Sequence, residues 1–149
     1  MTKRVLALAS AGGHWQQLML LRPAFAHHQV VYLNTLEGLA AQFDAAPAFV
    51  VPDCNRNTPL QVLLCAGALM VRMLRFRPHV VISTGALPGV LALAIGRLMG
   101  ARTIWVDSVA NAEEMSSSGR MARHVAHLRL SQWKTPAEAE GAEYAGSLL

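Results

Sequence analysis

The segment from Val5 to Gln17, VLALASAGGHWQQ, restricts the fold of this chain more than any other part of it. An apolar run ends in small residues, among them Ser10, Gly12 and Gly13, and at His14 the apolar spacing changes to that of a helix. Glycines at such a turn let the backbone approach a ligand, and the free N–H groups of the helix favour an anion. The segment therefore predicts a strand, a turn and a helix that bind a phosphate or diphosphate. A tight connection without a ligand is the alternative interpretation.

Two common nucleotide-binding motifs do not fit this turn. A dinucleotide fingerprint needs three glycines at fixed offsets and an acidic residue about twenty positions further on. Here the second predicted strand ends at Asn34, and Thr35 follows it. A nucleoside-triphosphate loop ends in a lysine followed by serine or threonine, whereas no lysine lies between Lys3 and Lys134. We therefore expect no NAD, no such triphosphate loop and no cofactor.

The same plan recurs in the second half of the chain. Residues 79–84 (HVVIST) predict a strand that enters a turn at Gly85, and residues 90–99 predict a helix that ends at Gly100. Further strands are expected at residues 29–33, 49–51, 102–106 and 128–131, and shorter helices at residues 36–43 and 120–127. This alternation predicts a parallel, doubly wound, Rossmann-like α/β sheet. Ligands bind beyond the carboxyl ends of such strands, so the two glycine turns would face one crevice.

Residues 59–77 predict an apolar helix, with Thr58 as its cap and Pro59 in its first position. The whole chain is 53% hydrophobic with a mean hydropathy of +0.31, so some apolar surface is expected to stay exposed. The helix is too short to span a bilayer, which takes ~20 apolar residues. It would either lie buried on the sheet with its arginines solvated, or dip into the inner leaflet. In the second case Arg72, Arg75 and Arg77 would contact lipid phosphates.

The charge and the cysteines narrow the choice of partners and compartment. The net charge is +4, but the arginines are dispersed among apolar residues without aromatic-plus-basic motifs, so no nucleic acid is expected. Cys54 and Cys65 lack metal-ligand spacing, and no signal peptide precedes the first strand, which indicates a reducing, cytosolic compartment. His124 and His127 have a spacing that metal ligands use. Because no third ligand lies nearby, we expect no metal site.

Candidate chemical groups lie at the ends of the predicted strands. His14 would donate to a phosphate or act as a general base, because histidine as a residue type exchanges protons near neutral pH. Asp107, at the end of the strand 102–106, is the rival base. A diphosphate would be held by Ser117, Ser118, Gly119 and Arg120. An ordinary polar loop is the alternative interpretation of that stretch, and we interpret Glu113 and Glu114 as solvated loop charges.

Four segments, in this order and spacing, resemble a known family. They are residues 9–17 (ASAGGHWQQ), 83–89 (STGALPG), 107–121 (DSVANAEEMSSSGRM) and 131–133 (SQW). The set is similar to the membrane-associated subunit of the two-part N-acetylglucosaminyltransferase of the dolichol pathway, and to its bacterial counterparts in exopolysaccharide assembly. The likeness covers nearly the whole chain to Trp133. The segments also look similar to the acceptor-side half of the enzyme that adds N-acetylglucosamine to lipid I.

The resemblance implies the N-terminal half of a GT-B glycosyltransferase, with an acceptor-binding domain at residues 1–133 and a tail or docking segment at residues 134–149. It implies inverting transfer from a UDP-sugar to a polyprenyl-diphosphate-linked saccharide at the cytoplasmic face of the inner membrane. A second subunit would carry the nucleotide-sugar half, so we expect this chain to be inactive alone. The catalytic residues would be His14 and Asp107. The substrate would contact Ser10, Gly12, Gly13, Gly85, Ser117, Ser118, Gly119 and Arg120. A non-catalytic membrane scaffold that anchors a catalytic partner is the alternative.

The sequence departs from the family pattern at three points. Asp107 stands where glutamate is usual, and Ala110 and Asn111 replace an alanine–arginine pair. No N-terminal transmembrane helix is present in the sequence. The first two departures concern contacts with the substrate. The third assigns membrane attachment to the helix at residues 59–77.

Overall fold

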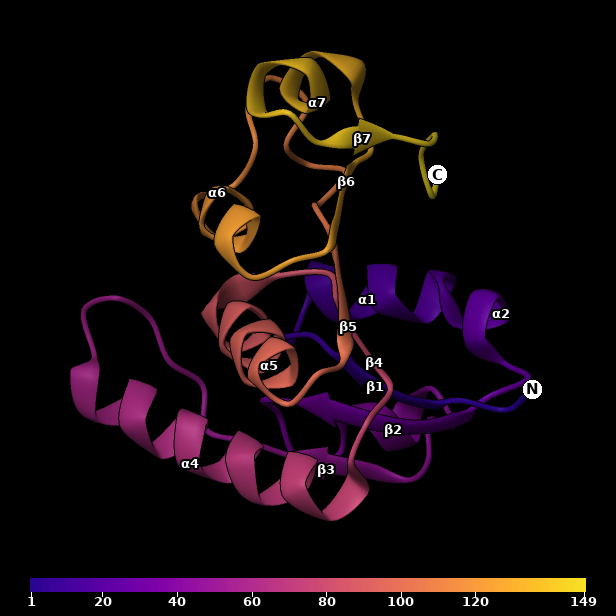
Figure 1. Cartoon of the computed structure of the whole chain (residues 1–149), viewed down its shortest axis with the longest axis vertical. Coiled ribbons are helices and arrows are strands. Elements are labelled where there is room, and N and C mark those ends of the chain that lie inside the picture. Colours follow the sequence, from indigo (N-terminus) through magenta and orange to yellow (C-terminus); the bar gives the residue numbers. More distant parts are fainter.

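The computed structural model describes all 149 residues and contains one seven-stranded sheet (Figure 1). Neighbouring strands are all parallel, in the order β3-β2-β1-β4-β5-β6-β7. The strands are β1 (Arg4–Leu8), β2 (Gln29–Asn34), β3 (Ala48–Val50), β4 (Val80–Ser83), β5 (Arg102–Val106), β6 (Leu128–Ser131) and β7 (Glu143–Tyr144). The chain order reverses between the adjacent strands β1 and β4. The predicted Rossmann-like α/β sheet is therefore confirmed.

Strand β1 is buried on both faces, which explains its continuous apolar run. Leu6 packs into the core on one face of the sheet and Val5, the preceding residue, into the core on the other. In the register of the sheet, Leu6 lies opposite Val31 of β2 and Val81 of β4. A parallel strand covered by helices on both sides has no polar face, so alternation is absent from its sequence.

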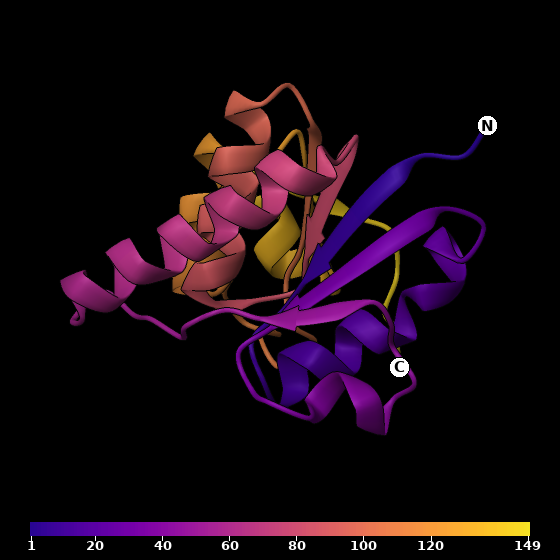
Figure 2. The same cartoon turned by 90° about the horizontal axis from the view of Figure 1, so that it is seen from below.

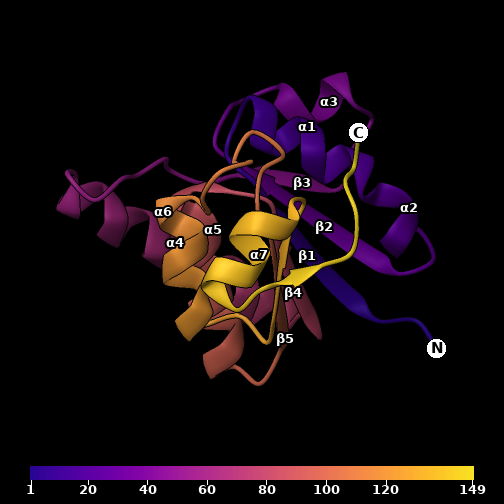
Figure 3. The ribbon, with the colours of Figure 1, turned by 90° about the horizontal axis from the view of Figure 1, so that it is seen from above.

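Helices cover both faces of the sheet (Figures 2 and 3). One layer contains α1 (Gly13–Leu20), α2 (Arg22–Phe25) and α3 (Leu39–Gln42). The other contains α4 (Pro59–Phe76), α5 (Ala86–Leu98) and α6 (Ser117–Met121), followed by a 3-10 turn at Ala122–His124. A last helix, α7 (Lys134–Glu140), lies beside β6 and β7. Trp15 of α1 anchors the first layer and Leu69 of α4 the second, and both side chains are fully buried.

Helix α4 packs only one of its faces. Cys65, Leu69 and Met73 are buried, and the helix rests on α5. The opposite side exposes Leu60, Leu63, Leu64, Met70, Val71 and Leu74, which we call the apolar face of α4. We expected this helix to be too short to span a bilayer, but by length and composition alone α4 would be able to cross a membrane, and only 17% of it is buried inside the fold. A surface helix of a soluble domain normally shows polar residues here, so this face needs another explanation.

The two ends of α4 are formed differently from the prediction in one respect. Pro59 is the first helical residue and Thr58 occupies the N-cap position, both as expected, but the Thr58 side chain makes no capping hydrogen bond to the helix. Its hydroxyl accepts a hydrogen bond from the N–H of Asn55 at 3.0 Å and donates to the Asn55 carbonyl at 3.1 Å, so it closes the preceding turn. At the other end Arg77 takes a left-handed φ of 52° and stops the helix.

Three histidines, which we call the strand-end histidines, hold the amino ends of the strands together. They are His28, His79 and His127, and each directly precedes a strand. The Nδ1 atom of each accepts a hydrogen bond from a backbone N–H at the start of a neighbouring strand, from Lys3 (3.1 Å), Arg4 (2.9 Å) and Thr103 (3.1 Å) respectively. An accepting ring nitrogen carries no proton, so protonation of the ring would break this bond.

Helix starts and one strand differ from the predicted elements. Helix α5 begins at Ala86, four residues before the predicted start at residue 90. The helix expected at residues 120–127 is instead α6, which begins three residues earlier because the Ser116 hydroxyl accepts from the N–H of Gly119 at 2.9 Å and caps it. Strand β7 was not predicted. It adds to the sheet edge with Tyr144 opposite Ser131, and its two residues are too few to show a strand pattern.

Candidate functional site

The two glycine turns meet at the carboxyl ends of β1 and β4. The hydroxyl of Thr84, which follows β4, donates to the carbonyl of His14 at 2.5 Å. Gly12 precedes α1 with a φ of 86°, which glycine adopts without strain, and no side chain caps the helix. The chain order reverses between β1 and β4, and ligands of doubly wound sheets bind at such a switch point. The two turns are thus in contact, as the sequence predicts.

His14 lies directly against Gly85. A Cβ atom added at Gly85 would overlap the imidazole ring, with Nδ1 as its nearest atom, so any larger residue would displace the histidine. The Nδ1 atom is buried and has no hydrogen-bond partner in the protein. Buried polar atoms are nearly always paired, and an unpaired one calls for an explanation. Nε1 of the neighbouring Trp15 is buried without a partner as well, whereas the rest of the His14 ring is partly exposed and can meet a ligand.

The backbone beside this histidine is strained, and the first turn has open space next to it. Ala86, the first residue of α5, has a φ of 68°, which costs a non-glycine residue roughly 1–2 kcal/mol. Strain of this kind clusters at functional sites. No atom lies within 4 Å of a Cβ built on Gly12 or Gly13, so a ligand has room to approach. Ser10 is buried at the end of β1.

Asp107, the rival base, is buried and fully hydrogen-bonded. Its Oδ1 accepts from Trp105 Nε1 at 3.0 Å and from Ser116 Oγ at 2.6 Å. Its Oδ2 accepts from the backbone N–H of Ser116 at 3.0 Å and from Asn111 Nδ2 at 3.2 Å. The three donors on Asn111 and Ser116 fasten the loop before α6 to the end of β5, which itself contains Trp105. The geometry favours a positioning role for Asp107 over the base role expected from the sequence.

Gly119, in the predicted diphosphate loop, is held by packing. A Cβ atom at this position would meet Oδ1 of Asp107, so only glycine lets α6 lie this close to the carboxylate. Its carbonyl accepts from Nη1 of Arg129 at 3.0 Å. Arg129 is buried, which lowers its pKa, and its Nη2 donates to the carbonyl of Glu140. This guanidinium therefore clamps α6 to α7, a role that no sequence motif indicates.

The other three members of that loop remain at least partly accessible. Ser117 and Ser118 are half-buried in the first turn of α6. Arg120 is exposed and forms an ion pair with Glu114 at 3.7 Å. An exposed pair of this kind contributes little to stability, so the guanidinium of Arg120 can exchange its partner for a phosphate at small cost. Glu114 is exposed, in agreement with the interpretation as a loop charge.

A buried pair of glutamines connects the segments that carry the family resemblance. Nε2 of Gln132 donates to Oε1 of Gln17 at 2.6 Å and to the carbonyl of Asp107 at 2.9 Å. Gln17 donates in turn to Ser108 Oγ at 3.0 Å and accepts from the N–H of Val109 at 3.0 Å. Neither glutamine is among the predicted site residues. The sequence feature that could have identified them is their position inside the segments ASAGGHWQQ and SQW.

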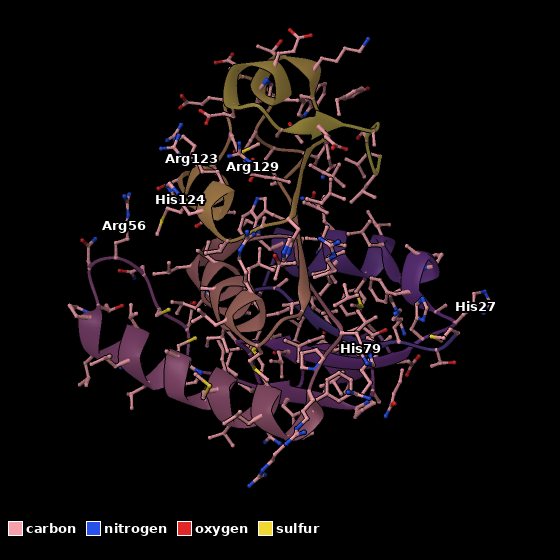
Figure 4. All side chains as sticks on the ribbon, in the orientation of Figure 1. His27, Arg56, His79, Arg123, His124 and Arg129 are labelled. Carbon is pink, nitrogen blue, oxygen red and sulfur yellow. The ribbon has the colours of Figure 1, made fainter.

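The fold does not gather metal ligands. No group of three or more His, Cys, Asp or Glu side chains lies close enough to hold a metal ion. Figure 4 shows His124 beside Arg123 on the outside of the α6 region, and Arg123 Nε lies 3.2 Å from His124 Nε2. Cys54 and Cys65 are free and buried, and burial raises the pKa of Cys65 to about 12. That thiol is therefore protonated and unreactive near neutral pH.

A cavity of about 500 Å³ lies at the carboxyl ends of β2 and β3. Its lining is mainly apolar, and Glu37 and Asp44 are its acidic groups. His14 and Gly85 are not among its lining residues. The contact between His14 and Gly85 therefore lies outside this cavity.

The fold and the position of these turns define a class: the chain is a Rossmann-like half-domain of the GT-B type. It is similar to MurG from Acinetobacter baumannii, with 15% identity and a TM-score of 0.75 over 97% of this chain and 44% of that one. UDP-N-acetylglucosamine 2-epimerase from Rickettsia bellii matches at 13% identity and a TM-score of 0.74, and the match covers 99% of this chain and 46% of that one. A glycosyltransferase from Rickettsia africae ESF-5 matches at 11% identity and a TM-score of 0.60, and the match covers 88% of this chain and 37% of that one.

These likenesses establish the fold, because sequence identity is low throughout. The chain spans less than half the length of each of these structures. No protein-family model matches the sequence, and no curated protein matches it.

Proposed function

We propose that this chain is the acceptor-binding subunit of an inverting glycosyltransferase. The enzyme would move a sugar from a UDP-sugar to a polyprenyl-diphosphate-linked saccharide in exopolysaccharide or lipid-linked oligosaccharide synthesis. The fold supports the sugar-nucleotide part, since MurG, a UDP-N-acetylglucosamine 2-epimerase and a glycosyltransferase share it. The four segments that resemble the family support the polyprenyl-diphosphate-linked acceptor and the role as one subunit of a pair. The observation that carries the proposal is the partly exposed imidazole of His14, which lies against Gly85 where the two glycine turns meet.

In this proposal the turns bind the diphosphate and His14 moves the proton. The free N–H groups at the start of α1, after Gly12, bind the diphosphate of the acceptor. The partly exposed imidazole of His14 takes the proton of the acceptor hydroxyl while that oxygen bonds to the anomeric carbon of the sugar. The bond between this carbon and UDP breaks at the same time, and UDP leaves with the electron pair. A single displacement of this kind inverts the anomeric configuration.

A second subunit is proposed to complete the cleft and to stabilise the leaving UDP. The experiment is coexpression with the product of an adjacent reading frame, followed by transfer of labelled sugar from a UDP-sugar to a polyprenyl-diphosphate acceptor. The pair should transfer sugar, whereas the purified chain should not, because one half-domain lacks the facing wall of the site. Turnover by the chain alone would contradict this part of the proposal.

The apolar face of α4 is proposed to hold the subunit on the cytoplasmic surface of the inner membrane. Leu63 is 70% exposed and would dip among the lipid chains, while Arg75, exposed near the end of the helix, would contact lipid phosphates. Arg72 differs from the other two predicted membrane arginines. Its Cζ atom lies 3.7 Å from the centroid of the Phe49 ring, so a cation–π contact within the protein already engages it.

A non-catalytic scaffold that anchors a competent partner is the second candidate. The bonding of Asp107 favours it, because one of the two expected bases already has four donors. Alanine replacements of His14 and of Asp107, made separately in the reconstituted pair, discriminate between the two functions. The scaffold predicts full activity in both variants as long as the complex stays intact. The catalytic subunit predicts lost transfer in His14→Ala.

A further inference from the structure

A group of cations surrounds a cavity at the amino ends of the strands, on the side of the sheet away from the glycine turns. The cavity measures about 620 Å³. Its lining consists of Lys3, Arg4, Leu74, Arg77, Pro78, His79, Met99 and Gly100. Figure 4 shows His79 on the side of the chain's N-terminus, far from Arg56 in the loop that leads into α4. Nothing in the proposed transfer reaction uses this cavity.

The backbone holds these cations close together. Nε of Arg4 donates to the carbonyl of Arg77 at 2.8 Å, which ties the first strand to the end of α4. The N–H of Arg4 donates to Nδ1 of His79 at 2.9 Å. Since Nδ1 accepts, the neutral ring carries its proton on Nε2, which is therefore a donor. Arg102 is adjacent, because its N–H donates to the carbonyl of His79 at 2.9 Å.

No carboxylate neutralises this group. The one ion pair in the protein joins Arg120 to Glu114, at the other end of the sheet. Like charges held in one place repel each other. Partial desolvation lowers the pKa of the neighbouring His79 imidazole, and the positive charges of Arg4 and Lys3 lower it further. An anion in the cavity would remove this repulsion.

We propose that this cavity is a phosphate-binding site. Guanidinium groups match the oxygens of a phosphate with paired hydrogen bonds, and Lys3 adds a mobile point charge. The cavity wall includes Leu74, which also belongs to the apolar face of α4, so the site adjoins that face. A lipid head group and a soluble phosphate ester present the same chemistry to these side chains. The site would add an anion-specific contact to the proposed membrane attachment.

The test is a titration of the full chain with inorganic phosphate, followed through the NMR signals of the His79 ring. We expect a saturable shift of those signals. The double variant Lys3→Gln/Arg77→Gln should weaken phosphate binding by about tenfold or more, because hydrogen bonds to charged groups are lost. The matched control is Arg123→Gln, at an exposed arginine that does not line the cavity. Its affinity for phosphate should stay within about twofold of the parent value, because distant charges are screened.

A second arm separates the two sources of phosphate. The site would be assigned to an anionic lipid if phosphatidylglycerol vesicles compete with inorganic phosphate at His79 and phosphatidylcholine vesicles do not. Phosphate binding that is unaffected by both vesicles would assign it to a soluble ester. The absence of a saturable shift with phosphate and with vesicles, or an equal loss in Arg123→Gln, would overturn the site. The titration needs neither a sugar donor nor a partner subunit, so its outcome is independent of the proposed transfer.

Discussion

Gln17 and Gln132 stand 115 positions apart in the sequence and share a buried hydrogen bond of 2.6 Å from Nε2 of Gln132 to Oε1 of Gln17. The bond joins the first helix, which carries His14 at its start, to the end of β6. Gln132 also bonds the carbonyl of Asp107, so the same amide fixes the loop that leads to α6. One pair of side chains therefore holds the two parts of the proposed acceptor site in a fixed relation.

Removal of this pair should be costly and strongly non-additive. Gln132→Ala leaves the buried carbonyl of Asp107 without this donor and removes one of the two donors to Oε1 of Gln17, so we expect a loss of about 1–3 kcal/mol in the free energy of unfolding. Gln17→Ala should cost a similar amount for the same reason. Urea denaturation of both single variants and the double variant gives the coupling energy, which we expect at about 0.5–3 kcal/mol. Additive losses would show that the bond does not couple the two segments.

Gly85→Ala should impair sugar transfer with little effect on folding of the sheet. The added methyl group would overlap the His14 ring and push it from its place between the turns. Gly67→Ala in the exposed part of α4 is the matched control, since nothing lies near its Cβ. It should stabilise the helix by up to about 1 kcal/mol and leave transfer unchanged. Equal transfer rates in the Gly85 variant and the parent chain would show that the position of His14 is irrelevant.

Acid should weaken the fold through two of the strand-end histidines. Partial desolvation lowers the pKa of His79 and of His127, and nearby cations lower both further. Between a lowered folded pKa and the unfolded value the unfolded chain binds more protons, so the free energy of unfolding falls as pH drops below about 6.5. His79→Asn and His127→Asn keep an acceptor but do not titrate. Urea midpoints measured between about pH 7.5 and about pH 5.5 should vary less in these variants than in the parent.

The apolar face of α4 predicts two separable contributions to vesicle binding. Leu63→Ser should lower sedimentation with neutral and anionic vesicles alike, and because this side chain is 70% exposed the fold should survive. Arg75→Gln should lower only the binding to anionic vesicles, by roughly 1 kcal/mol, and salt should reduce the difference. Leu69→Ser, at a fully buried position of the same helix, is the control that should unfold the chain. Unchanged binding in both surface variants would place the attachment elsewhere.

The sequence predicted the sheet because its central strands are buried on both sides. Such strands are continuous apolar runs, and the glycines that follow β1 and β4 mark where each turn begins. The same reasoning placed His14 and Gly85 at neighbouring strand ends. It did not show why position 85 must be glycine, because the atom that excludes a side chain there belongs to a residue about seventy positions away.

Other features depend on contacts that no local pattern contains. The role of Asp107 follows from donors on Trp105, Asn111 and Ser116, which the fold assembles around it. The histidines before β2, β4 and β6 gain their hydrogen bonds only from the register of the strands. Helix α4 was the ambiguous case, since its composition suits either a buried or an exposed apolar face, and the structure contains both.

The most direct test of the proposed function is the rate of sugar transfer by the reconstituted pair when His14 is changed to Gln. The glutamine keeps a polar side chain of similar length but does not accept a proton, so the complex should assemble normally. We predict that transfer from the UDP-sugar to the polyprenyl-diphosphate acceptor falls by about 10²–10⁴-fold, the usual contribution of a general base. An intact complex that transfers sugar at the parent rate would contradict the assignment of His14 and favour the scaffold.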